Sequence, residues 1–378
     1  MTLDQCHSIL DLRAQARRRL PGPVFNYLDG GAETEFTLRR NTTAFEDRQL
    51  IPRYLVDVSS VSTTTRILGR NIDLPIFCAP TGASCIYHPD GELAVARAAA
   101  QAGTYYSLSV AGTHSIEAVA AASAGPLMLQ ALLFKDRGLT RELIEKCKAS
   151  RYQALCLTVD AAIRGKRERE LRSGIPARPT LVTRARILLR PRWWMAQMLR
   201  GPLRMPNLAA RSGHGGFLAS AQYLERQLDV SATWEDVRKL IQIWGGPFIL
   251  KGIMCADDAR KAIAVGATAI LVSNHGGRQI DGAPAPIEVL PQIAQDVGDR
   301  IEVLLDGGIR RGSHVLKALA LGAKACAIGR PYLYGLSAGG EAGVQRALEL
   351  LKAELVAAMR FCGCTDVRRV AESVVRPL

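Results

Sequence analysis

The chain has 378 residues, of which 48% are hydrophobic and 22% charged, a balance typical of a globular protein with a large core. No apolar run reaches about 18 residues and the start lacks the layout of a signal peptide, so we expect neither a membrane-spanning helix nor secretion, and a cytoplasmic location. The net charge is +14, but residues 164–211 hold 13 Lys and Arg against two acids (net +11), which leaves only +3 elsewhere and argues against a general nucleic-acid-binding protein.

Residues 1–70 precede the regular part of the chain. Residues 7–20 have the period of an amphipathic helix, and residues 21–31 are typical of a second helix that ends at glycines. We expect these helices to form an extension that either covers the N-terminal side of the following domain or leans on one edge of it.

Eight short apolar runs rich in branched residues then follow, in residues 74–80, 105–110, 127–133, 154–160, 247–253, 269–277, 302–308 and 325–331. Runs that are apolar on both faces are typical of buried parallel strands, and segments of helical period separate most of them. This order predicts a (β/α)8 TIM barrel over residues 71–378, with a long insertion after the fourth strand at residues 165–230. A doubly wound open sheet is the alternative, but no G-x-G-x-x-G turn follows the first run.

Polar side chains or glycines end every predicted strand. The carboxyl ends of the strands form the functional face of such a barrel, so we expect these residues to meet in one site. In chain order they are Pro80, Thr81, Gly82, Ser109, Gln130, Thr158, Asp160, Lys251, Ser273, His275, Asp306, Gly308, Gly329 and Arg330.

The stretches "LLDGGIRRG" and "AIGRP" follow the last two strands, where barrels commonly bind phosphate. Glycine lets backbone N–H groups approach an oxyanion, and Arg310 or Arg330 can add charge; two structural turns are the plainer alternative. The amide of Gln130 and the hydroxyl of Thr158 suit a flavin ring, whose reduced form Lys251 could stabilise. Together they predict a large cofactor with a phosphate.

The stretch "SNHGGRQID" places His275 three residues before Arg278. A guanidinium can hold a carboxylate while a neighbouring imidazole accepts a proton from the adjacent carbon. Asp160 could stabilise the imidazolium, and Arg167 offers a second guanidinium. A structural histidine in a polar turn is the alternative, which the rest of the set makes less favoured.

The motifs "VFNYLDGGAETEFTLRRN", "APTG", "LTVD", "KGI", "SNHGGRQID", "DGGIRRGSHVLKALALGA" and "IGRPYLYGL" resemble the FMN-dependent 2-hydroxy acid oxidase/dehydrogenase family, most closely its (S)-mandelate and bacterial L-lactate dehydrogenases. The resemblance spans nearly the whole chain. It implies oxidation of an (S)-2-hydroxy acid to the 2-oxo acid, FMN as cofactor, no metal and a homo-oligomer.

The resemblance also implies roles for individual residues. His275 would be the base and Asp160 its partner, while Arg278 and Arg167 would hold the substrate carboxylate with help from Tyr27. Lys251 would lie near the flavin ring. The FMN site would further comprise Pro80, Thr81, Gly82, Ser109, Gln130, Thr158, Ser273, Asp306, Gly308, Arg310, Gly329 and Arg330.

Three positions bear on the substrate and the electron acceptor. Leu132 stands where the family commonly has tyrosine, and Ala111 where some members have a large side chain, so we expect an aromatic or longer aliphatic acid rather than glycolate. Gly82 is typical of the dehydrogenase-like members. The main alternative is an oxidase that uses oxygen and releases hydrogen peroxide; another is a catalytically weakened, FMN-binding module.

Residues 176–212 interleave apolar residues, Trp193 and Trp194 with arginines and contain no acid. One interpretation is an active-site lid. The other is a monotopic segment that binds anionic lipid on the inner face of the plasma membrane and passes electrons to quinone, as the resemblance suggests. Nucleic acid is not an expected partner.

The nine cysteines are odd in number and lack metal-like spacing, and several lie in apolar runs. We therefore expect buried thiols. The pair Cys362 and Cys364 carries no assigned role.

Overall fold

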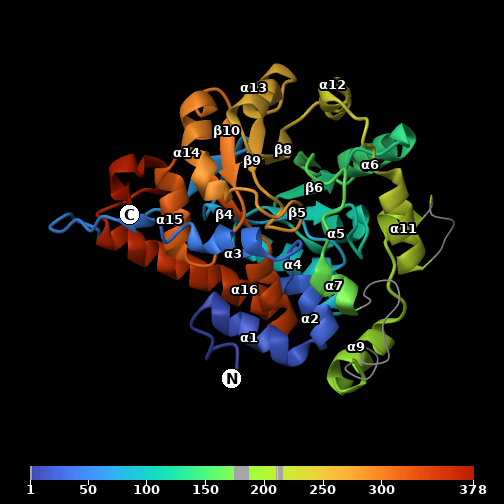
Figure 1. Cartoon of the computed structure of the whole chain (residues 1–378). Coiled ribbons are helices and arrows are strands. Elements are labelled where there is room, and N and C mark those ends of the chain that lie inside the picture. The colour runs from blue at the N-terminus through green and yellow to red at the C-terminus, as the bar shows by residue number, and fades with distance from the viewer. Residues whose placement is uncertain (1, 174–186, 210, 212–215) are drawn as a thin grey trace.

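Eight parallel strands form a closed barrel in the structure, a computed structural model that describes residues 2–173, 187–209, 211 and 216–378 (Figure 1). The strands are β4 (Ile76–Cys78), β5 (Tyr106–Ser109), β6 (Leu127–Ala131), β7 (Ala154–Thr158), β8 (Phe248–Ile253), β9 (Ala269–Val272), β10 (Glu302–Leu305) and β11 (Ala325–Ile328). Each lies within a predicted run, so the barrel prediction is confirmed.

The strands are shorter than the runs that predicted them, because the chain leaves the sheet where polar residues begin. The sixth run was expected to reach Gly277, but β9 ends at Val272. His275, Gly276 and Gly277 all have positive φ, at 58°, 63° and 73°, and three such residues in succession do not continue an extended strand. His275 and Arg278 therefore lie on a loop above the rim of the barrel, whereas Ser109, Gln130, Thr158 and Lys251 lie within their strands.

Helices surround the barrel as the periodic segments predicted. They are α4 (Gly91–Gln101), α5 (Ile116–Ala122), α6 (Arg137–Ala149), α12 (Trp234–Trp244), α13 (Ala256–Ala264), α14 (Pro286–Val297), α15 (Gly312–Ala320) and α16 (Arg330–Phe361). Local chemistry sets their ends. For example, α12 starts at a capping box of Thr233 and Asp236 and stops at Gly245, whose φ is +70°. Non-helical backbone at Gly339 and Gly340 interrupts α16.

A hairpin, and not the N-terminal helices, covers the N-terminal end of the barrel. The hairpin pairs β2 (Thr65–Ile67) with β3 (Arg70–Ile72), and it packs Ile67 and Leu68 on the apolar interior of the barrel. The backbone N–H of Leu68 donates to Glu302 Oε2 at the start of β10 (2.8 Å). The first alternative is therefore wrong for the helices, although residues 65–70 at the end of the extension do cover this side.

The N-terminal helices instead lean on one edge, as the second alternative predicted. Figure 1 shows α1 (Ile9–Arg19) and α2 (Gly22–Asp29) beside α16. Asp29 joins these elements: it accepts hydrogen bonds from Arg13 of α1 (2.7 Å) and Tyr334 of α16 (2.7 Å). Next, α3 (Phe36–Thr43) leads to β1 (Arg48–Leu50), which pairs with β12 (Val375–Pro377).

The insertion after β7 holds α7 (Glu168–Ser173), α9 (Pro191–Arg200), α10 (Pro206–Ala209) and α11 (Phe217–Gln227). Parts of the predicted segments at 165–230 and 176–212 lie outside the described residues. No helix in the described ranges is long and apolar enough to cross a membrane. The nine cysteines are all free thiols; seven are buried and Cys255 is exposed.

Candidate active site

One cavity of about 570 Å³ opens at the carboxyl ends of the barrel strands. Its volume is in the range of small-molecule sites, roughly 300–1,000 Å³. Its wall brings together most of the predicted site residues: Tyr27, Pro80, Thr81, Gly82, Ser109, Gln130, Leu132, Thr158, Arg167, Lys251, His275, Arg278, Asp306, Gly308, Arg310, Gly329 and Arg330. Two predicted residues, Asp160 and Ser273, lie behind this wall.

His275 and Asp160 are in contact, as predicted. Asp160 Oδ1 lies 3.0 Å from His275 Nδ1, so the carboxylate keeps a proton on Nδ1 and leaves Nε2 as the acceptor. Burial lowers the pKa of His275, the charge of Lys251 adds to this, and Asp160 offsets only part of it. Burial opposes ionisation of Asp160, yet the charges of His275 and Lys251 lower its pKa. The pair is therefore a neutral imidazole beside a carboxylate at neutral pH.

Lys251 is buried and charged at the end of β8. Its Nζ donates to Ser273 Oγ (3.0 Å) and lies 3.6 Å from Asp306 Oδ2. Burial disfavours the ammonium, but the negative charges of Asp306 and Asp160 raise the pKa of Lys251. Ser273 is fully buried and does not line the cavity. Its hydroxyl also accepts a hydrogen bond from the His275 backbone N–H (3.1 Å).

Three arginines approach one buried carboxylate, Glu170, and the half-exposed Arg164 is one of them (3.5 Å to Oε2). Arg278 donates to Glu170 Oε1 (2.7 Å), and Arg167 lies 3.9 Å from Glu170 Oε2. Arg278 also donates to the carbonyls of Tyr27 (2.9 Å) and Gly30 (2.8 Å), which fixes its guanidinium near the Tyr27 ring. Burial and then the charge of Arg278 lower the pKa of Arg167 to about 10. One carboxylate for several guanidiniums favours binding of a further anion here.

Arg310 and Arg330 also line the cavity, and the Arg330 guanidinium adjoins that of Arg278, because both donate to the Gly30 carbonyl (2.8 Å each). Arg310 donates to the Ile309 carbonyl (2.7 Å), and Arg330 donates to the carbonyls of Gly276 (2.9 Å) and Gly30 (2.8 Å). Among the residues that the structure describes, neither arginine forms an ion pair with a carboxylate. Burial lowers the pKa of both, to about 10 for Arg330. Two such guanidiniums in one wall require an anion, and phosphate has the matching geometry.

Gly308 makes this end of the site possible. Its φ is +83°, and a Cβ there would lie 1.7 Å from the Asn41 carbonyl oxygen of α3. Only glycine therefore lets the loop after β10 pass between α3 and the cavity.

Several buried polar atoms at the cavity have no hydrogen-bond partner within the described residues: Thr158 Oγ1, Asp306 Oδ1 and Arg330 Nε in the wall, and Asp160 Oδ2 behind it. Buried polar groups are normally paired, so these atoms indicate a ligand that offers both donors and acceptors. A flavin ring and a phosphate tail have that combination. The residues present thus fit the cofactor predicted from the strand ends.

The mouth of the cavity is apolar and comes largely from the insertion. Leu132 and Ala111 line it from the barrel, and insertion residues including Trp193, Met205 and Phe217 complete it. Trp193 donates from Nε1 to the Ile86 carbonyl (2.9 Å) and lines the cavity, so its side chain faces the barrel and not a membrane. Sequence reasoning had not assigned this wall to the insertion.

Glu170 and Gln279 were also missed. Glu170 is one of only two acids in the basic segment, and that isolation was the available signal. Gln279 donates to the Asp160 carbonyl (2.6 Å), and its Oε1 accepts from the Gly165 backbone (3.2 Å). It thereby holds the loop after β7 against the loop after β9.

Comparison with known proteins gives consistent matches. Residues 16–377 match the family described as FMN-dependent dehydrogenase. The L-lactate oxidase of Nostoc sp. is 42% identical over 371 residues, which are 97% of each chain. The crystal structure of the monotopic membrane protein (S)-mandelate dehydrogenase superposes with a TM-score of 0.95 at 37% identity, over 99% of this chain and 100% of that one. A soluble mutant of the membrane-associated (S)-mandelate dehydrogenase from Pseudomonas putida gives 0.86 at 36% identity, over 99% and 100%.

The phosphate assignment can be tested by comparing FMN with riboflavin, which lacks the phosphate. We expect Arg310→Met to weaken FMN binding by about 10-fold or more, since a charge-assisted hydrogen bond contributes roughly 1.5–3 kcal/mol. Riboflavin affinity should be unchanged within about 2-fold. Titration of the apoprotein with each flavin measures both, with the exposed Arg311→Met as control. Equal losses for the two flavins would contradict the assignment.

Proposed function

The chain belongs to the FMN-dependent dehydrogenase family and carries out FMN-dependent oxidation of a 2-hydroxy acid, and from this premise we propose a substrate, a set of catalytic roles and an electron acceptor. The substrate that we propose is an (S)-2-hydroxy acid with an aromatic or longer aliphatic side chain. The electrons leave to quinone at an anionic membrane surface. A homo-oligomer, which the resemblance implied, stays a prediction.

Arg278 and Arg167 hold the substrate carboxylate in this proposal. A guanidinium has five N–H groups, and Arg278 uses three of them on Tyr27, Gly30 and Glu170, so two remain for a ligand. Glu170 keeps the two guanidiniums side by side without neutralising both. The carboxylate is thereby placed beside His275, with Tyr27 covering the Arg278 face.

His275 takes up the proton that leaves the substrate carbon, at Nε2. The contact of His275 Nδ1 with Asp160 supports this role. It keeps the proton on Nδ1, so the lone pair of Nε2 is free and points away from Asp160. Asp160 then stabilises the imidazolium. FMN, when bound, would supply the two-electron oxidant, and the hydroxyl proton of the substrate would be lost to solvent in the same oxidation. The charged Lys251 lies where it would meet the flavin ring, beside Asp306.

The single observation that carries the choice of substrate is the apolar mouth of the cavity. Leu132 offers methyl groups and no hydroxyl, Ala111 leaves space, and Trp193 adds an aromatic edge. Burial of a larger side chain against them is favourable by about 0.8 kcal/mol per methylene. A small polar acid would leave this surface uncovered.

The role of His275 predicts both a rate and a pH profile. We expect His275→Asn to retain FMN but to slow flavin reduction by substrate by about 10²- to 10⁴-fold, because Asn tolerates the positive φ and cannot act as the base. Burial lowers the pKa of His275 below its ordinary 6.5, and the neutral form is active. The second-order rate constant should therefore rise with pH below about 6.5 and be flat above about pH 7.

Anaerobic stopped-flow measurements across pH test this prediction, with the exposed His7→Asn as control. Reduction within a few-fold of the wild-type rate in His275→Asn would show that another group removes the proton.

The apolar mouth predicts the order of substrates. Specificity constants should rise by about 4-fold per added methylene from glycolate upward, and mandelate should exceed glycolate. Leu132→Tyr should reduce this preference by adding a hydroxyl, whereas Leu132→Met should preserve it. Steady-state kinetics on a side-chain series with an artificial acceptor gives the comparison, and a wild-type preference for glycolate would refute the proposal.

The outer surface of the insertion supports a membrane acceptor. No residue of α9 is buried, and its outer side exposes Met195, Met198 and Leu199 (46%, 71% and 90% exposed), with Leu188 and Leu189 next to it. The segment contains no acid, so its arginines can meet anionic head groups. The lid and membrane interpretations are thus compatible, because the inner side of the same helix lines the cavity. Oxygen is the alternative electron acceptor, and it is supported by the name of the Nostoc relative, an L-lactate oxidase.

The membrane proposal predicts binding to vesicles that contain anionic lipid, with release at high salt. A double variant, Met198→Glu with Leu199→Glu, should lower the bound fraction about 10-fold or more, because carboxylates enter the interface poorly. It should leave flavin reduction unchanged, since neither side chain lines the cavity. Vesicle sedimentation measures binding, with the exposed Leu10→Glu on α1 as control. Failure of wild type to sediment, together with stoichiometric peroxide under air, would favour the oxidase.

A further inference from the structure

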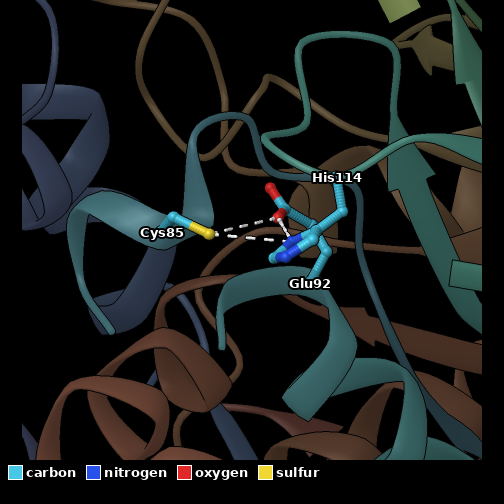
Figure 2. A group of neighbouring side chains, drawn as sticks. All are labelled: Cys85, Glu92 and His114. Carbon is cyan, nitrogen blue, oxygen red and sulfur yellow. Dashed lines mark hydrogen bonds and ion pairs between the residues drawn. The ribbon is translucent and has the colours of Figure 1, made fainter. Parts of the chain in front are cut away.

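A second group of reactive side chains lies outside the substrate cavity. Cys85 is in the short helix η1 (Ser84–Ile86) after β4, Glu92 is in the first turn of α4, and His114 is in the turn after β5. Figure 2 shows the thiol, the carboxylate and the imidazole pointing toward one another from these three elements. None of them lines the substrate cavity or takes part in the oxidation.

The distances among the three side chains are close to those of a tetrahedral metal site. Cys85 Sγ lies 3.6 Å from His114 Nδ1 and 3.9 Å from Glu92 Oε2, and Nδ1 lies 2.9 Å from Oε2. Zinc bonds of about 2.0–2.3 Å in a tetrahedron place ligand atoms roughly 3.3 to 3.8 Å apart. Shifts of a few tenths of an ångström would bring all three atoms onto one ion.

The surrounding protein fixes the carboxylate. Glu92 is fully buried, and its Oε1 accepts from the backbone N–H groups of Ser84 (3.0 Å) and Thr113 (2.8 Å). Thr113 Oγ1 also donates to the carboxylate. These donors hold Oε2 toward Cys85 and His114. Hydrogen bonds behind a ligating carboxylate are what orient it in known metal sites.

We propose that Cys85, Glu92 and His114 form a binding site for a divalent cation of the zinc class. A thiolate and an imidazole select zinc-like ions over magnesium or calcium, which prefer oxygen ligands. The fourth position belongs to a water, which can enter beside His114, whose side chain is 19% exposed. Binding releases the thiol proton of Cys85 and the Nδ1 proton of His114 to solvent.

The site lies under the part of the insertion that covers the cavity. Gln197 of α9 donates to the Cys85 carbonyl (2.8 Å), and Asn207 of α10 donates to the His114 carbonyl (3.3 Å). A cation would therefore join the two loops on which α9 and α10 rest. We expect the cation to stabilise the contact of these loops with the insertion and not to take part in the chemistry at His275.

Without a cation, the same geometry would be a hydrogen-bonded trio in which His114 donates to Glu92. The two states differ in a measurable way, because only the metal site binds an ion stoichiometrically and responds to loss of the thiol. The test needs variants that keep the buried Glu92, since its removal would strand backbone donors of Ser84 and Thr113.

The experiment titrates the FMN-loaded full chain, with its thiols kept reduced, with Zn²⁺ in a metal buffer. A second titration uses Co²⁺, whose absorption bands report thiolate ligands and tetrahedral geometry. We expect one equivalent to bind and to raise the melting temperature. Cys85→Ser and His114→Gln should each weaken binding by at least about 100-fold, since even the loss of a supporting partner costs about 10- to 100-fold. The control, Cys255→Ser, removes an exposed thiol and should bind as wild type does.

Absence of stoichiometric binding by wild type, or binding that Cys85→Ser and His114→Gln leave intact, would overturn the proposal and identify the group as the hydrogen-bonded trio. If one site variant fails to fold, the other decides. Cobalt bands without thiolate character would likewise place the ion elsewhere.

Discussion

The pairing of β11 with β4 is the constraint on which the site depends. Ile328 lies opposite Cys78, 250 residues away in the chain, and this parallel register closes the barrel. Closure brings all eight strand ends to one rim, so that residues from opposite ends of the sequence meet. The Thr81 hydroxyl, for example, lies 2.7 Å from the Tyr332 hydroxyl. An open sheet of the same strands would separate the loop after β4 from the loop after β11, and the cavity would lose one wall.

The arginines of the cavity wall differ in how far carboxylates neutralise them. Arg278 and Arg167 share Glu170, whereas Arg310 and Arg330 have no carboxylate partner in the described part of the chain. In the first pair, part of the positive charge is uncompensated, which suits a substrate that must leave after reaction. In the second pair, no carboxylate compensates the positive charge, which suits a cofactor that stays bound. Differences in local neutralisation can therefore explain how one cavity binds one anion transiently and another persistently.

The sequence was sufficient to predict the barrel and most residues of the cavity wall. Apolar runs locate the buried strands, and the residue after each run must lie at the rim. The sequence also predicted the contact of His275 with Asp160. It did not predict Glu170, the inward side of Trp193 or the buried position of Ser273, which depend on the paths of loops and on packing between distant segments. The group of Cys85, Glu92 and His114 was invisible for the same reason. Its members come from a short helix, the first turn of α4 and a turn after β5, and its single cysteine has no partner spacing to reveal it.

The two sides of the helix α9 have different surroundings. Trp193 and Gln197, one turn apart, face the barrel, while Met195, Met198 and Leu199 face outward. Under the proposed function, substitutions on the first side would change the shape of the cavity, and substitutions on the second would change attachment to a membrane. Under the proposed function, substrate selectivity and membrane attachment would thus depend on opposite sides of one ten-residue helix, and each could be tuned by design while the other is held constant.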